Sequence, residues 1–113
     1  MHVERFLPLT PVVFEIALAL AAGERHGYEI MQDVERRTDG TIVLHPGTLY
    51  RALGRLLDQG LIEELDERPA GEDDERRRYY RLSPLGHAVA RAEVERLASQ
   101  VSAARRLFRG DRA

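Results

Sequence analysis

The fold of this chain is decided by residues 46–59, which read PGTLYRALGRLLDQ. Pro46 suits the first position of a helix, where its missing N–H costs nothing, and Gly60 supplies a stop, so one helix is predicted from Pro46 to Gln59. Its apolar stripe consists of four leucines at helical spacing, Leu49, Leu53, Leu56 and Leu57. The polar side chains on its exposed faces are Thr48, Tyr50, Arg51 and Arg55. Such a helix buries one stripe and leaves an open face with two arginines one turn apart.

A strongly apolar helix is predicted upstream, from Pro11 to Ala22. Thr10 can cap its free amides, Pro11 fits its first turn, and Gly23 closes it. Apolar side chains lie on nearly all of its sides, so it must be covered on more than one side. A partner subunit is one candidate cover.

A second helix is predicted between these two, from Gly27 to Arg37. Its inward stripe is formed by Tyr28, Ile30, Met31 and Val34. Residues 38–40 end it, and the short β-branched run from Thr41 to Leu44 is predicted to be extended.

Two strands are predicted after the third helix, from Leu61 to Arg68 and from Arg76 to Leu82. Proline, glycine and an acidic run separate them, so together they indicate a β-hairpin. Period-two alternation places Tyr80 inward with Leu82. The same alternation places Arg77, Tyr79 and Arg81 outward.

The last helix is predicted from Pro84 to Phe108, and Ser83 precedes it as a cap. Ala90 begins an apolar series at alternating spacings of four and three, the seam of a coiled coil. The predicted dimerisation residues on this seam are Val94, Leu97, Val101, Ala104 and Phe108. The alternative is a helix folded back on its own domain, but a monomer this small has little left to cover the stripe.

Composition narrows the classes of function. The chain has 113 residues, which suits one domain with a modest core. It has no cysteine and its four histidines lie far apart, so we expect no disulfide, no metal site and no cofactor. No apolar stretch approaches the roughly 20 residues that span a bilayer, so a cytoplasmic protein without membrane contact is expected. Neither a nucleophile with a placed base nor a phosphate-binding glycine loop is present, so we do not expect an enzyme.

The order helix, helix, helix, hairpin, helix is that of a winged helix-turn-helix. This is a mainly α (α+β) fold with a two-stranded wing and, here, a long C-terminal helix. We expect residues 1–83 to form the DNA-binding domain and residues 84–113 the dimerisation helix and tail, as one structural unit. A helix fits the major groove of DNA and its N-terminal amides favour phosphate, and Gly47 has no side chain to keep a phosphate away.

Four segments carry recognisable motifs: His26 to Ile30, Pro46 to Leu53, Leu56 to Ile62, and Arg76 to Leu82 leading into Gly86. In this order and spacing they resemble the PadR-like family of bacterial transcriptional regulators, in particular short members with one C-terminal dimerising helix. The resemblance covers almost the whole chain from Leu9 onward. This chain departs from the family in having Arg51 where proline usually follows the tyrosine, and in the acidic run from Glu72 to Glu75.

The resemblance implies that Thr48 and Tyr50 hold phosphates at the start of the reading helix. Arg51 and Arg55 are the candidates for base readout, because arginine to guanine is the commonest specific contact. The alternative is that both arginines only solubilise the helix, with Arg55 near Asp58. Tyr28 is either a core residue or a phosphate contact at the start of its helix.

The wing has two interpretations as well. Arg76, Arg77 and Arg78 are predicted to clamp phosphate, with Tyr79 packing against sugar. The net charge of −2 gives no general support for nucleic-acid binding, so any basic surface must be local. The alternative is that acidic residues of the facing strand and loop pair with these arginines across the hairpin.

Together these patterns predict a sequence-specific DNA-binding transcriptional regulator, by resemblance a homodimeric repressor. Two-fold symmetry would place two reading helices about 34 Å apart on double-stranded DNA and imply a palindromic operator. The resemblance also implies a small apolar effector between the first and last helices, where Phe14 and Phe108 are the only aromatic candidates. Plain packing explains both, so no effector site is predicted. The alternative function is a winged-helix module for protein–protein contact without direct DNA binding.

Overall fold

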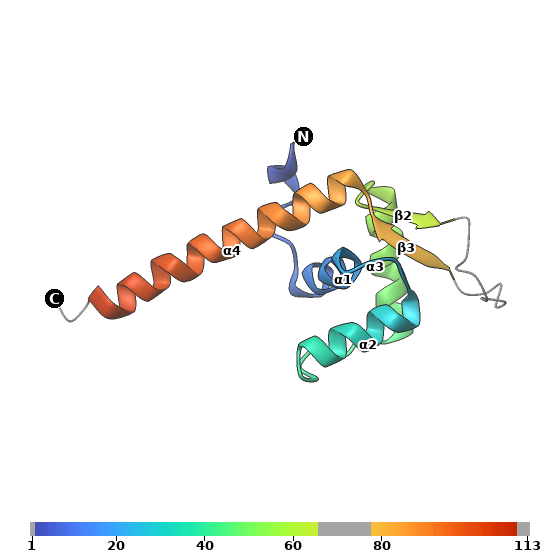
Figure 1. Cartoon of the computed structure of the whole chain (residues 1–113), viewed down its shortest axis with the longest axis horizontal. Helices are drawn as coiled ribbons and strands as arrows, with labels where there is room; N and C mark the ends of the chain where they lie inside the picture. The colour runs from blue at the N-terminus through green and yellow to red at the C-terminus, as the bar shows by residue number, and fades with distance from the viewer. Residues whose placement is uncertain (1, 66–77, 111–113) are drawn as a thin grey trace.

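The computed structural model describes residues 2–65 and 78–110. A compact head carries one long helix that runs away from it, and the whole measures 63 × 33 × 24 Å (Figure 1). The elements in chain order are a 3-10 helix η1 (Val3–Phe6), α1 (Pro11–Ala21), β1 (Arg25–His26), α2 (Gly27–Arg37), α3 (Pro46–Asp58), β2 (Ile62–Leu65), β3 (Tyr79–Leu82) and α4 (Pro84–Gly110). This is the winged-helix fold that the sequence predicts, with its long C-terminal helix.

The predicted helix starts are confirmed by their caps. The Thr10 hydroxyl accepts a hydrogen bond from the Val13 amide at 3.2 Å, so it satisfies a free donor of the first turn of α1. Ser83 does the same for α4, accepting from the Gly86 amide at 3.0 Å. The helix ends differ from prediction by one or two residues, which is the ordinary fraying of helix termini.

The sheet has three antiparallel strands in the order β1-β3-β2, so β3 is central. Ile62 pairs with Leu82 on one side of β3, and His26 pairs with Tyr79 on the other. Of these three strands, the sequence predicts β2 and β3 but not β1, because two residues are too few to show an alternating pattern. The predicted extended run from Thr41 to Leu44 is a bend and loop outside the sheet.

The core lies where α1, α2, α3 and the sheet meet. Its fully buried members include Ile16, Ile30, Val34, Leu49 and Leu53. The predicted leucine stripe of α3 is therefore confirmed in its main part, and Leu57 packs at the edge of the core.

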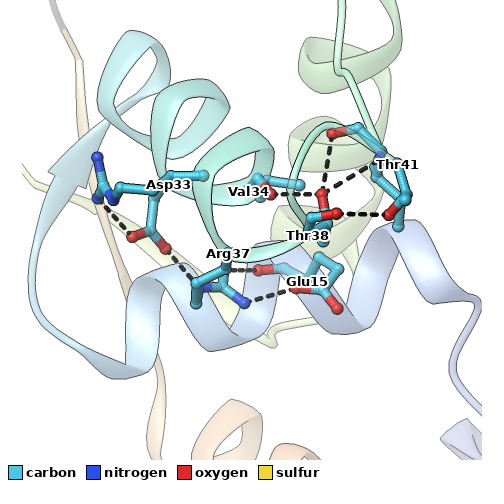
Figure 2. Close-up of polar contacts among 8 residues, drawn as sticks. Glu15, Asp33, Val34, Arg37, Thr38 and Thr41 are labelled. Atoms are coloured by element: carbon cyan, nitrogen blue, oxygen red, sulfur yellow. Dashed lines mark hydrogen bonds and ion pairs between the residues drawn. The ribbon is translucent and has the colours of Figure 1, made fainter.

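Two polar clusters hold α2 in place, one on its α1-facing side and one at its end. The Asp33 carboxylate accepts from the Arg37 Nε at 2.9 Å, and Arg37 also donates to the backbone carbonyl of Glu15 in α1 at 2.9 Å. Figure 2 shows this cluster beside a second one, in which the Thr38 hydroxyl donates to Val34 O at 2.8 Å. Burial raises the pKa of Asp33, but the hydrogen bond and charge of Arg37 outweigh it, and the pKa is lowered overall.

The first turns of α4 are anchored to the head. Glu93 is 1 % exposed, and its carboxylate accepts from Arg96 at 2.6 and 3.0 Å and from the Leu9 amide at 3.1 Å. The hydrogen bond from Arg96 lowers the pKa of Glu93, burial opposes it, and the Leu9 amide adds to the lowering. Glu93 is also the last fully buried residue of α4, so the helix leaves the head beyond this point.

Candidate nucleic-acid interface

The start of α3 is open to solvent. His45, Pro46, Gly47 and Thr48 are all exposed, and no side chain caps the first turn. A Cβ added at Gly47 would meet no atom within 4 Å, so the fold leaves room there. Free backbone amides and the positive end of the helix dipole make this turn suited to bind a phosphate.

The exposed face of α3 carries the predicted reading residues. Tyr50, Arg51 and Arg55 are exposed, while Leu49 and Leu53 on the opposite side are at most 1 % exposed. Within the part of the chain that the structure describes, neither arginine forms an ion pair or a hydrogen bond. The predicted proximity of Arg55 to Asp58 therefore produces no ion pair, and neither guanidinium group donates a hydrogen bond to another described residue.

Tyr50 lies across the first turn of α2. A Cβ added at Gly27 would overlap the Tyr50 hydroxyl and lie 2.9 Å from its Cζ atom. Any larger residue at position 27 would therefore displace the end of the Tyr50 side chain, which occupies that volume. This contact ties the surface of α3 to the start of α2.

Tyr28 is 59 % exposed, which corrects its predicted place on the inward stripe. The inward face of α2 runs through Gly27, Ile30 and Val34, and Tyr28 is rotated about 100° from Gly27 on the helix. Its side chain is consequently free to contact a partner beside the start of α3. Met31 is half-buried, and it lines an open groove with Tyr28 and Leu44.

The two wing arginines among the described residues form ion pairs with glutamates of the facing strand. Arg78 lies 3.5 Å from Glu64, and Arg81 donates to Glu63 at 2.9 Å across the two strands. These pairs support the cross-strand interpretation for β2 and β3, although all four side chains are exposed enough for the pairs to be weak. The predicted contacts Arg76 and Arg77 lie outside the described residues.

Tyr79 is 8 % exposed, which corrects its predicted outward position. Its ring meets the His26 ring edge to face, with centroids 5.2 Å apart. Alternation does place Tyr79 and Tyr80 on opposite faces of β3, but the side chain of His26, from the neighbouring strand β1, packs against Tyr79 on the face that was expected to be open. Tyr80 is buried as predicted, and its pKa is raised by burial and then by the nearby Glu64 and Tyr50.

Two histidines near this surface were not predicted as functional residues. His45 is exposed at the N-cap of α3, beside Gly47. His26 is the N-cap of α2 and forms a capping box with Glu29, a pattern whose three-residue spacing is visible in the sequence. The spacing did not lead to a predicted cap at His26, because histidine is not among the usual capping residues.

The predicted dimerisation residues follow the last buried turn of α4. Val94, Val101 and Phe108 are 43, 49 and 76 % exposed, and Leu97 and Ala104 are half-buried. Ala90, by contrast, belongs to the core of the head, so the start of the apolar seam packs within its own chain. Between Phe14 and this part of α4 lies an open groove of about 570 Å³, lined also by Val94, Leu97 and Val101.

Residues 2–65 and 78–110 contain no candidate metal centre or membrane span. No group of three or more histidines and carboxylates there could hold a metal ion. In the same residues no helix is both long and apolar enough to cross a membrane.

Comparisons with known proteins agree with this geometry. The chain is 35% identical over 65 residues to an uncharacterized protein of Lysinibacillus sphaericus, a match that spans 58% of each chain. The structure of a transcriptional regulator from Clostridium thermocellum superposes with a TM-score of 0.69 at 28% identity, covering 84% of this chain and 87% of that one. Bacillus subtilis PadR in complex with operator DNA superposes with a TM-score of 0.63 at 20% identity, covering 77% of this chain and 48% of that one. The model of the transcriptional regulator PadR-like family matches residues 16–92, more than half of the chain, and the protein therefore belongs to the PadR-like family of transcriptional regulators.

Proposed function

We propose that this transcriptional regulator binds DNA sequence-specifically as a homodimer and has no enzymatic activity. The observation that carries the proposal is the open face of α3, where the first turn is uncapped by side chains and Arg51 and Arg55 have no partner among the described residues. The relative from Bacillus subtilis was solved with operator DNA, which supports a similar role for the same fold here.

The contacts divide into phosphate and base contacts. Gly47, Thr48 and Tyr50 hold phosphates at the start of α3, and Tyr28 adds a contact from the neighbouring start of α2. Arg51 and Arg55 reach base edges in the major groove, where each good bidentate contact discriminates by about 1–3 kcal/mol. Arg76, Arg77 and Arg78 hold phosphate from the wing, where Arg78 must leave Glu64 to do so. Tyr79 was predicted to pack against sugar, but its ring is buried against His26, so we assign it the role of supporting the wing strand β3 rather than contacting DNA.

The dimer forms through α4, with residues 1–83 as the DNA-binding domain and residues 84–113 as the dimerisation element. Val94, Leu97, Val101, Ala104 and Phe108 would pack against the same residues of a second copy, because in the single chain they are exposed or only half-buried. Two-fold symmetry then matches a palindromic operator.

We further propose that the protein acts as a repressor whose DNA affinity responds to a small apolar effector. The support is the groove between Phe14 and α4, whose lining is mostly apolar and which the second subunit would border. A ligand there shifts DNA affinity only if it favours one arrangement of the two heads over another.

Titration of a fluorescent duplex from the region upstream of the protein's own gene tests DNA binding. We expect Arg51→Ala to weaken binding to this duplex about tenfold and to an unrelated duplex much less, because it removes base readout. Arg91→Ala is the matched control, since it removes an exposed arginine from α4 near the head without touching α3.

The salt dependence separates the outcomes. Phosphate contacts should make even non-specific binding visible at low salt, so no binding there would overturn the proposal and favour a protein–protein module. Equal weakening of both duplexes by Arg51→Ala would instead identify Arg51 as a phosphate contact.

A further inference from the structure

His26 belongs to two elements of the head at once. It is the last residue of β1, where it pairs with Tyr79 of the wing strand β3, and it is the N-cap of α2. Its side chain is buried, with the residue 6 % exposed, so it cannot itself reach DNA.

The ring of His26 is held on both sides. Its Nδ1 atom accepts from the Glu29 amide at 3.3 Å, and the Glu29 carboxylate accepts from the His26 amide at 3.1 Å. The opposite ring nitrogen, Nε2, lies 3.5 Å from the same carboxylate. The ring also meets Tyr79 edge to face at 5.2 Å, with an interplanar angle of 79°. One side chain thus connects the first turn of α2 with the central strand.

The residues that follow His26 belong to the DNA-facing surface. Gly27 lies directly under the Tyr50 hydroxyl, and Tyr28 is the exposed aromatic residue at the start of α2. Any shift of this first turn therefore moves Tyr28 and changes the surface on which Tyr50 rests. Because Tyr79 lies in β3, the same shift changes the position of the wing relative to α3.

We propose that His26 is a positioning residue for DNA binding, a joint that holds β3 and the first turn of α2 in one arrangement and thereby orients Tyr28 and Tyr50. The inference rests on the proposed DNA-binding function and deepens it. The capping bond and the ring contact are separate parts of this joint, so each can be removed alone.

Two substitutions separate the parts. His26→Asn keeps a capping acceptor and loses the ring contact with Tyr79, whereas His26→Phe keeps a ring and loses the acceptor. Thr38→Val is the matched control at the other end of α2, where it removes the hydroxyl bonds to Val34 O and from the Ile42 amide. It weakens the same helix at its C-terminal end, the opposite end from His26 and Tyr28.

Dissociation constants for the upstream duplex are measured at a temperature where circular dichroism shows every variant folded. We expect each His26 variant to bind about tenfold more weakly, and Thr38→Val to bind within about twofold of the wild type. If the His26 variants bind like the wild type, the joint has no role in DNA binding. If the wild type itself does not bind, the proposed function fails instead.

A double-mutant cycle with Tyr28→Phe distinguishes positioning from general loss of stability. If His26 acts by orienting Tyr28, removing the Tyr28 hydroxyl costs less affinity in the His26→Phe background than in the wild type. Equal costs in the two backgrounds would show that His26 does not act through Tyr28 and would overturn the proposed mechanism.

Discussion

At the scale of single residues, the glycines of this chain show how closely its elements approach one another. A Cβ at Gly86 would overlap the carbonyl oxygen of Leu61 and lie 2.9 Å from its carbonyl carbon. Because those atoms belong to the backbone between α3 and β2, they cannot move without shifting the sheet. Gly54, inside α3, has nothing within 4 Å of an added Cβ.

Gly86→Ala is expected to destabilise the protein by about 2–3 kcal/mol, because it forces α4 away from Leu61. Gly54→Ala, the matched control, should instead stabilise it by about 0.5–1 kcal/mol, because alanine loses less backbone freedom in a helix. Urea unfolding followed by circular dichroism at one protein concentration measures both. Similar effects for the two substitutions would show that Gly86 does not sit in a tight crossing.

Some side-chain positions were predictable from the sequence and others were not. The buried leucines of α3 were predictable, since a helical period identifies an apolar stripe without knowledge of the neighbours. The orientation of Tyr28 was not, because a rotation of one residue around α2 depends on what α2 packs against. Tyr79 was predicted to point outward, but its ring packs against His26, which belongs to a strand of two residues that is too short to show a pattern in the sequence.

At the scale of elements, local signals specify where helices begin, and long-range contacts specify how they pack. Thr10 and Ser83 both cap the helices that they were predicted to cap. Nothing local in the sequence indicates that Glu93 of α4 would accept from the amide of Leu9. This bond joins residues 84 positions apart and connects the N-terminal segment to α4.

The Glu93 contacts make stability depend on pH in acid. Since the pKa of Glu93 is lowered in the folded protein, its stabilising effect is present above its ordinary value of 4.5 and is lost as the pH falls through the lower, folded value. The pKa of Asp33 is lowered as well, so its stabilising effect is also lost in acid. We expect the free energy of unfolding to fall steadily below about pH 4.5.

Glu93→Gln should lower the free energy of unfolding at pH 7 by about 1–2 kcal/mol and make its decline in acid less steep. Glu95→Gln, which changes an exposed carboxylate on the same helix, should keep the wild-type profile. Urea unfolding at several pH values measures this. An unchanged slope in Glu93→Gln would assign the acid sensitivity to other carboxylates.

At the scale of the whole molecule, the head and the extended part of α4 have different surfaces. The head holds the hydrophobic core, whereas α4 runs away from the head (Figure 1) and beyond Glu93 carries apolar side chains at a regular spacing that are exposed or only half-buried. A helix with this pattern is stabilised when a second helix covers its seam. A dimer formed there joins two heads through one rigid element, so the spacing of two DNA contacts would follow from the geometry of α4.

Val101→Glu tests whether this seam joins the two DNA contacts. Val101 is 49 % exposed and lies outside the core, so the substitution should leave the fold intact while placing two carboxylates in the dimer seam. We expect a folded monomer by sedimentation at micromolar concentration. Binding to a palindromic duplex should fall at least about a hundredfold, because the second head no longer binds at a high effective concentration, while binding to a single half-site should hardly change.

Ser99→Glu adds the same charge on the other side of α4 and should remain a dimer with wild-type affinity. If Val101→Glu remained dimeric, α4 would not be the interface, and if it became monomeric without loss of palindrome binding, dimerisation would not be what links the heads on DNA.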